Sequence, residues 1–182
     1  MHESWMSPNV RLARSAVEGR GIFAVSTIAR DETILVWGGP SYTDRAGALR
    51  ARAEGKGVMQ WDEDVFSHEI EGGMEDAFLL NHSCDPNAWM ADAYTITARK
   101  EIAPGEEITA DYALWETEAT DETSWICRCG SPLCRGRNTG NDWMDARLQE
   151  RYRGHFSPLL EKRIERAERR GPGALREPDA TE

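Results

Sequence analysis

The sequence predicts a mainly β domain with some α-helix. Three observations support this fold class. Short runs rich in β-branched and aromatic residues recur between residues 21 and 111, Gly and Pro turns separate them, and helical spacing of apolar residues is confined to a few segments. A chain of 182 residues, 40% of them hydrophobic, is long enough to bury one core. We therefore expect one domain, with or without an appendage.

The expected elements follow one another in chain order. Apolar runs predict strands at Gly21–Val25, Thr33–Trp37, Val58–Phe66, Tyr94–Ala98 and Ile108–Asp111. The Ala- and Arg-rich segment 44–54 predicts a helix between the second and third of these strands. The turn at Pro104-Gly105 separates the last two strands.

The character of the chain changes after Gly136. Asn141 or Asp142 can cap a helix whose apolar residues recur at four-residue spacing, namely Met144, Leu148 and Tyr152. Ser157-Pro158 is a good cap and first residue for a second helix, with Leu159, Leu160 and Ile164 on one side. The tail 171–182 consists of Gly, Pro and charged residues, and we expect it to be disordered.

Charge and hydropathy narrow the functional classes. The net charge of −10 argues against general affinity for nucleic-acid phosphate and favours basic partners. Acidic residues crowd segments 62–76 and 106–122, which either attract a lysine-rich peptide or form a solvated face. The first twelve residues lack an apolar signal-peptide core, and no run reaches 18 apolar residues. We expect a cytoplasmic protein that does not bind membranes.

The four cysteines predict one zinc site. Three lie together in CRCGSPLC as Cys127, Cys129 and Cys134, and Cys84 lies in NHSCDPN. A tetrahedral zinc site takes four ligands, and in a reducing compartment clustered cysteines favour metal over disulfides. Three alternatives remain open: a disulfide, His82 as the fourth ligand in place of Cys84, and a nucleophilic pair of Cys84 with His82.

Four segments carry a resemblance to a known family. They read EGRGIFA at 18–24, NHSCDPN at 81–87, GEEITADY at 105–112 and CRCGSPLCRG at 127–136. In this order they resemble SET-domain protein-lysine methyltransferases with a post-SET zinc segment. The resemblance implies the SET fold of short strands with a pseudoknot. It divides the chain into a SET domain (10–115), a post-SET zinc segment (116–140), C-terminal helices (141–170) and the tail.

The resemblance also implies a cofactor site. In the family the turn at Gly19, Arg20 and Gly21 touches the methionine end of S-adenosylmethionine, although by itself this turn could simply precede a strand. The amide of Asn81 suits recognition of adenine or of an amino-acid head group. Family members use the Asn81-His82 pair for the cofactor, with His82 acting chiefly through its backbone.

Tyr112 is the candidate catalytic residue. Methyl transfer to lysine needs an unprotonated amine, and free lysine titrates about three pH units above neutral. A nearby sulfonium and an apolar channel would lower the pKa of that lysine. A tyrosine hydroxyl at the cofactor end can then orient the amine without acting as a base. The alternative is a half-buried tyrosine with a packing role, and the surrounding GEEITADY favours catalysis.

Three positions depart from the family pattern. Trp37 replaces a tyrosine that often lines the lysine channel, and Ala110 replaces a Phe or Tyr that helps to set how many methyl groups are added. Both substitutions predict a wide, apolar channel. Phe78 replaces a frequent arginine and is interpreted as core packing. Trp125 and Trp143 flank the cysteine cluster, and each either caps the cofactor or simply packs.

These observations predict a zinc-stabilised, S-adenosylmethionine-dependent protein-lysine N-methyltransferase. Its expected partner is a basic, lysine-containing protein or peptide, and no oligomeric state is predicted. The minimal build and arginine-biased composition suggest a bacterial protein. The main alternative is a SET scaffold that holds a peptide without transferring methyl groups. A metallohydrolase would need an open metal position, which four thiolates do not leave.

Overall fold

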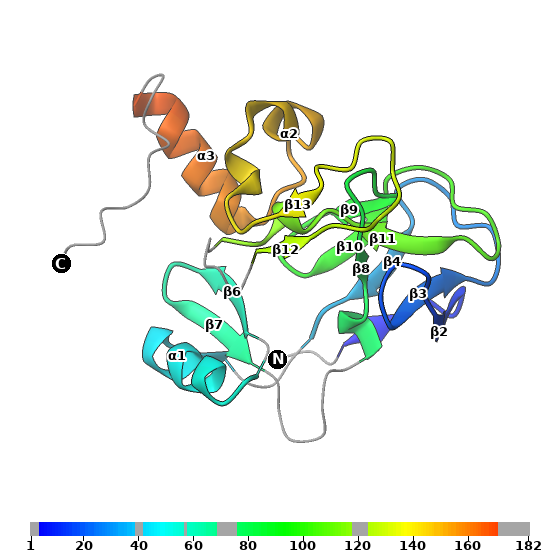
Figure 1. The fold of residues 1–182 in the computed structure, drawn as a ribbon, viewed down its shortest axis with the longest axis horizontal. Helices are drawn as coiled ribbons and strands as arrows, with labels where there is room; N and C mark the ends of the chain where they lie inside the picture. Colours follow the sequence, from blue (N-terminus) through cyan, green and yellow to red (C-terminus); the bar gives the residue numbers. More distant parts are fainter. Residues whose placement is uncertain (1–3, 39–41, 57, 69–75, 118–123, 171–182) are drawn as a thin grey trace.

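The computed structural model describes residues 4–38, 42–56, 58–68, 76–117 and 124–170. Short strands dominate this part of the chain and the helices are few, as the sequence predicts. Figure 1 shows most strands gathered in the body of the molecule, with α2 and α3 above and beside them, whereas β6 and β7 lie with α1 on a separate lobe. The predicted disordered tail lies outside the described residues.

Two four-stranded sheets form the body. The first has the order β1-β4-β10-β9, with strands Trp5–Met6, Thr33–Val36, Thr95–Ala98 and Ala88–Met90. The second has the order β2-β3-β11-β8, with strands Val10–Arg14, Arg20–Ala24, Glu107–Ala110 and Asn81–His82. The strands predicted at 21–25, 33–37, 94–98 and 108–111 therefore exist, each shifted by no more than a residue. Fully buried Ile22, Ile34, Leu35, Ile96 and Ile108 form their shared core.

One parallel pairing positions the site. Strand β8 pairs with β11 in parallel, with Asn81 opposite Thr109 and Ala110 opposite His82. The NHSCDPN and GEEITADY segments therefore lie side by side although 17 residues separate them in sequence. Beyond β11 the chain enters a 3-10 turn, Tyr112–Leu114. The predicted pseudoknot stays a prediction.

The lobe between β4 and β8 corrects one expectation. The segment Val58–Phe66, predicted as one strand, forms a hairpin of β6 (Val58–Asp62) and β7 (Val65–His68). Its turn falls at Glu63-Asp64, because charged residues favour a solvated turn over a continued apolar strand. Strand β5 (Tyr42–Thr43) completes this sheet. Helix α1 (Arg45–Ala53), which the sequence predicts over residues 44–54, packs beside it, and the side chain of Asp44 caps it.

The C-terminal part corrects another expectation. The hairpin β12 (Trp125–Ile126) and β13 (Arg137–Asn138) leads into a 3-10 turn, Asp142–Met144, and only then into α2 (Ala146–Arg151). Asn141 makes no side-chain cap, whereas Asp145 accepts the N–H of Arg147 and caps α2. The prediction of one helix that begins at Asn141 or Asp142 was therefore wrong, because the side chain of Asp145 caps a separate helix.

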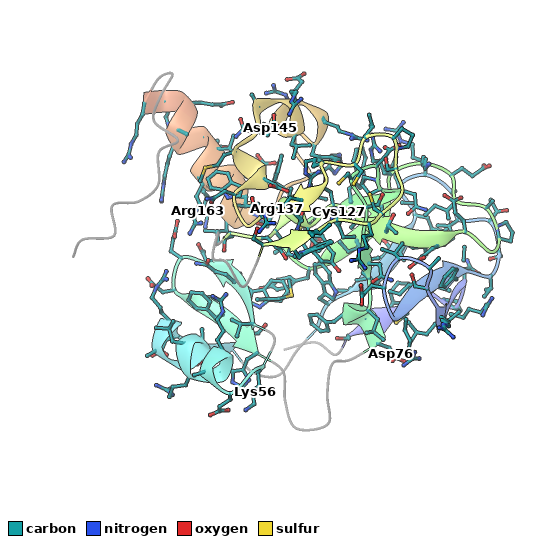
Figure 2. All side chains as sticks on the ribbon, viewed as in Figure 1. Lys56, Asp76, Cys127, Arg137, Asp145 and Arg163 are labelled. Carbon is teal, nitrogen blue, oxygen red and sulfur yellow. The ribbon has the colours of Figure 1, made fainter. Side chains whose placement is uncertain are left out.

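Helix α3 (Pro158–Arg170) buries Leu159, Leu160 and Ile164, as predicted. Its exposed side meets the β6–β7 turn, where Lys162 pairs with Asp62 and both Arg163 and Arg166 pair with Glu63. Figure 2 shows Arg163 on the side of α3 that faces the hairpin. Asp62 and Glu63 belong to the acidic segment 62–76. Because both carboxylates bind basic residues of α3, this part of the segment is neither a free docking surface nor a purely solvated face.

Candidate functional site

A cavity of about 370 Å³ lies where the four family segments meet. Its walls come from the turn before β3, from β8, from the turn after β11 and from β12. The lining residues are Val17, Glu18, Asn81, His82, Tyr112, Trp125, Ile126 and Arg128. Four of the predicted site residues therefore share one cavity. They are the predicted cofactor-binding residues Asn81 and His82, the candidate catalytic Tyr112, and Trp125, a candidate cofactor cap.

The glycine turn supports this cavity from behind. Gly21 is buried, and a Cβ there would lie 2.2 Å from Glu107 Oε1 and 2.8 Å from Asn81 Nδ2. Only glycine allows this close approach. Asn81 Nδ2 lies 3.1 Å from the carbonyl oxygens of Glu18 and Arg20 and 2.8 Å from Glu107 Oε1. Asn81 thus fixes the turn that forms one wall, a role that the sequence did not indicate. Gly19, Arg20 and Gly21 are not among the lining residues.

The four cysteines form one cluster. The sulfur atoms of Cys84, Cys127, Cys129 and Cys134 all lie within 4.8 Å of one another. The Cys84 and Cys127 sulfurs are 3.8 Å apart, and all four cysteines are free thiols, so the disulfide alternative is wrong. Four sulfurs placed about 2.3 Å from a central zinc would be about 3.8 Å apart, so the donor set fits this metal.

His82 connects the cysteine cluster to Tyr112. Its Nδ1 accepts the backbone N–H of Tyr112 at 3.2 Å, so Nε2 carries the proton, and Nε2 lies 3.3 Å from Cys84 Sγ. Burial lowers the pKa of His82 to about 4, which keeps the ring neutral. His82 therefore supports the sulfur of Cys84 from outside the four-sulfur cluster.

This geometry bears on the nucleophile alternative. The side chains of His82 and Cys84 do face one another, as a nucleophilic pair would require. Burial nevertheless raises the pKa of the Cys84 thiol to about 11, and its sulfur faces three other cysteines. Cys84 is consequently placed to hold a metal ion rather than to attack a substrate.

Tyr112 lies in the cavity wall at the start of its 3-10 turn. Its hydroxyl donates to the backbone carbonyl of Leu80 at 2.8 Å. Its ring centroid lies 5.2 Å from those of His82 and Trp115 and 6.1 Å from that of Trp125. Burial, and then the charges of Glu116 and Glu18, raise the pKa of Tyr112 well above its ordinary value. The hydroxyl is therefore protonated at neutral pH and can act as a hydrogen-bond donor.

Trp37 belongs to an aromatic cluster rather than to the cavity lining. It is buried, donates from Nε1 to the carbonyl of Ala77 at 2.9 Å, and stacks on Phe78 with centroids 5.9 Å apart. It also meets Trp61 at 6.2 Å and Trp115 at 5.2 Å, and Trp115 in turn contacts Tyr112. Trp37 thus reaches Tyr112 through one intervening ring, and Phe78 packs as the sequence suggests.

Ala110 and the two flanking tryptophans have distinct environments. Ala110 is fully buried in β11. Trp125 lines the cavity and meets His82 edge to face at 5.2 Å. Trp143 is buried in the core, only 4% exposed, and is absent from the described cavity lining. Of the two tryptophans, the structure brings Trp125 alone to the predicted cofactor site.

A smaller groove of about 130 Å³ lies on the other side of Trp115. Strand β6 and the end of α1 form one wall, and residues Trp115, Glu116 and Thr117 form the other. Thr117 Oγ1 donates to Gln60 Oε1 at 2.7 Å across the groove. Burial, and then the negative charges of Asp142 and Asp111, raise the pKa of Glu116 to about 7.

Sequence reasoning missed the ion pair behind Tyr112. Asp111 is 0% exposed, and Arg135 binds both of its carboxylate oxygens at 2.6 and 2.8 Å. The sequence did hold one signal for this ion pair. Asp111 directly follows the run ITA of a predicted strand, and a carboxylate buried there requires a cationic partner. The partner's identity was not readable, since Arg135 is 24 residues away in sequence.

Comparison with known proteins assigns the family. The model of the SET domain matches residues 19–113, which is more than half of the chain. The chain therefore belongs to the SET domain family.

Two relatives are histone-lysine N-methyltransferases. The H3 lysine-4 specific enzyme of Saccharomyces cerevisiae is 32% identical over 141 residues, which cover 70% of this chain and 13% of that protein. The trr enzyme of Drosophila melanogaster is 31% identical over 149 residues, which cover 74% of this chain and 6% of that protein. The chain thus spans only a small part of the length of these relatives.

The fold is also similar to a solved structure, KRYPTONITE in complex with mCHG DNA and SAH. The TM-score is 0.57 at 21% identity, with 72% of this chain and 29% of that chain covered. At this identity the likeness supports the fold, and it agrees with the mainly β architecture predicted from the sequence.

Proposed function

We propose that this protein transfers a methyl group from S-adenosylmethionine to a lysine side chain of a protein substrate. One observation carries the proposal: Tyr112 lines the larger cavity, and its ring contacts Trp115, which lines the smaller groove. A cofactor in the cavity and a lysine entering from the groove would meet beside the Tyr112 hydroxyl. Membership of the SET family and the names of the two relatives support the same chemistry.

The larger cavity suits the proposed cofactor. Its volume of about 370 Å³ falls in the range of small-molecule sites. Trp125 offers an aromatic face, and Glu18 a carboxylate, to a ligand that carries an adenine and positive charges. The close packing of Gly21 against Asn81 and Glu107 fixes the turn before β3, which forms one wall of the cavity. When bound, S-adenosylmethionine would supply an electrophilic methyl group on a sulfonium, whose sulfur would leave as a neutral thioether as the methyl carbon passes to a neutral lysine amine.

The residues of the chain would contribute alignment and exclusion of water. The Tyr112 hydroxyl, protonated at neutral pH, can orient the amine lone pair toward the methyl carbon. The rings of Trp115 and Trp125 flank it and keep water from the reacting atoms. The amine loses its proton to solvent before transfer, so Tyr112 need not act as a base. We also keep, as part of this proposal, the prediction that Trp37 and Ala110 make the lysine channel wide and apolar.

A basic protein or peptide is the proposed substrate. Glu116 in the groove and the net charge of −10 both favour a cationic ligand. The same net charge disfavours direct binding to nucleic acid. Among the described residues, no helix combines the length and the apolar character needed to cross a bilayer.

Zinc is the proposed structural metal, held by Cys84, Cys127, Cys129 and Cys134. The backbone N–H groups of Arg135 and Gly136 donate to the sulfurs of Cys84 and Cys134 at 3.4 Å, which suits thiolates. The metal would join the residues after β12 to the NHSCDPN segment. Free thiols favour a reducing compartment, and we place the protein in the cytoplasm.

The test is incubation with radiolabelled S-adenosylmethionine and a panel of basic proteins and lysine peptides. Label recovered on lysine would support the proposal. The alternative, a peptide-binding SET scaffold, predicts peptide binding without transfer. Calorimetry with S-adenosylhomocysteine, run in parallel, tells the two apart. A protein that binds neither cofactor nor peptide would contradict both.

A further inference from the structure

Asp111 is a buried carboxylate that directly precedes Tyr112. Its Oδ1 accepts the backbone N–H of Ala113 at 3.1 Å and so caps the 3-10 turn that carries Tyr112. Its Oδ2 accepts the hydroxyl of Tyr152 at 3.1 Å. A carboxylate that is 0% exposed is tolerated only when its charge is balanced. The geometry of the Tyr112 turn therefore depends on the group that balances Asp111.

Arg135 is that group. Its two terminal nitrogens donate to the two oxygens of Asp111 at 2.6 and 2.8 Å. Its Nε donates to Asp142 at 3.0 Å, and Nη2 also reaches Asn138 at 3.0 Å. Only 17% of the side chain is exposed. Two further titratable side chains lie near Asp111. They are the Tyr152 hydroxyl, at 3.1 Å, and His82, at 3.8 Å, whose ring is neutral at physiological pH.

The cysteine cluster holds Arg135 in place. Arg135 directly follows Cys134, and its backbone N–H donates to Cys84 Sγ at 3.4 Å. The strands β12 and β13 on either side of this segment have two residues each, too few to hold it by backbone pairing. The guanidinium reaches Asp111 because the four sulfurs fold residues 127–138 against β8.

We propose that Arg135 is a positioning residue that makes the placement of Tyr112 depend on the four-cysteine site. Loss of the metal, or oxidation of its thiols, releases the segment and withdraws the guanidinium. Asp111 then loses the cation that balances its charge, and its cap on the Tyr112 turn loosens. The catalytic consequence rests on the proposed function, whereas the coupling between the two sites is a property of the fold.

An arginine suits this position in a way that lysine does not. The planar guanidinium engages both oxygens of Asp111 while Nε binds Asp142, so one side chain joins two carboxylates from different segments. A lysine at 135 can approach only one of them closely. We therefore expect Arg135→Lys to restore charge balance without restoring the geometry.

The experiment follows Tyr112 directly. The four tyrosines are replaced by 3-fluorotyrosine, and the Tyr112 resonance is assigned with Tyr112→Phe. ¹⁹F spectra are recorded before and after two perturbations: metal removal with a chelator under reducing conditions, and thiol alkylation with iodoacetamide. The variants are Arg135→Met and Arg135→Lys. Arg137→Met is the matched control, because Arg137 lies two residues further on and binds Ser124 at 2.7 Å instead of Asp111.

In the wild type and in Arg137→Met, both perturbations should shift or broaden the Tyr112 resonance. In Arg135→Met with its metal still bound, the resonance should already be shifted and should respond little to the chelator. Turnover in Arg135→Met should fall by about tenfold or more in kcat with a smaller change in KM, and Arg135→Lys should recover it only in part.

If Arg135→Met does not fold, Asp111→Asn is added to remove the unbalanced charge, and the double variant is compared with Asp111→Asn alone. A Tyr112 resonance that is unchanged in Arg135→Met, or a wild-type resonance that ignores both perturbations, would overturn the inference. Absence of methyl transfer in a wild type that still shows the ¹⁹F coupling would instead count against the proposed function alone.

Discussion

Replacing Tyr112 with phenylalanine separates catalysis from stability because it removes a single oxygen. The structure shows one hydrogen bond for that oxygen, to the Leu80 carbonyl at 2.8 Å. Losing a bond of this kind costs about 0.5–1.5 kcal/mol of folding free energy. The ring contacts with His82, Trp115 and Trp125 remain. The variant should therefore be folded, with a melting temperature lower by only a few degrees.

Turnover should fall far more than stability. If the hydroxyl aligns the amine during transfer, kcat should drop by about 10²–10⁴-fold, which corresponds to roughly 3–5 kcal/mol of lost transition-state stabilisation. KM should change less, because the interaction matters most as the methyl group moves. Initial rates at saturating S-adenosylmethionine, together with calorimetric melting, measure both quantities on the same preparation.

The control is Tyr94→Phe, which also removes one hydroxyl but from a ring that contacts Trp61 and is absent from the described cavity lining. Its turnover should stay within about twofold of the wild type. The reasoning fails if Tyr112→Phe turns over at near wild-type speed. It fails equally if the loss of turnover is fully explained by a smaller fraction of folded protein or by weaker cofactor binding.

Three further outcomes are expected. Cys84→Ser should lose the bound metal, and native mass spectrometry that finds one zinc per chain in this variant would contradict the ligand assignment. Asn81→Ala should weaken S-adenosylmethionine binding by about 1–3 kcal/mol in calorimetry, because the turn behind the cavity wall loses its support; an unchanged affinity would place the cofactor elsewhere. The pKa of Glu116 in the folded protein, about 7, exceeds the ordinary glutamate pKa of 4.5. The free-energy penalty of burying its charge is therefore absent below pH 4.5 and grows until about pH 7. Glu116→Gln should therefore match the wild type in stability near pH 4 and exceed it near pH 8 by on the order of 2–3 kcal/mol. Denaturant unfolding of both proteins measures this, and the same stability difference at the two pH values would refute it.

Several features of the fold were readable because their signals are local. The strands at 33–37 and 94–98 follow from β-branched residues between turns, and α1 follows from Asp44 before an Ala- and Arg-rich segment. The four-cysteine cluster was readable because three of its members lie within eight residues and the chain contains only four cysteines. Tyr112 and Asn81 were identified through family motifs, and the structure places both in one cavity.

The errors came from competing local signals. The apolar residues at both ends of Val58–Phe66 suggest one strand, but Glu63-Asp64 forms a turn and the segment becomes a hairpin. In the C-terminal segment Asn141 and Asp145 can both start a helix, and only Asp145 caps one in the structure. Both sequence patterns permit two structures, and packing against neighbouring elements chooses between them.

The sequence by itself determined the motifs, the ligand set and the alternation of short strands, since each depends on residues that are close together in the chain. Tertiary structure decided which distant groups meet. The parallel pairing of β8 with β11 brings Asn81 beside the segment that ends in Tyr112. The cysteine cluster brings Arg135 to Asp111, and the hairpin turn at Glu63 meets α3 about a hundred residues later. Electrostatic partners such as these act through space, and no local pattern in a single sequence specifies which cation will balance a given buried carboxylate.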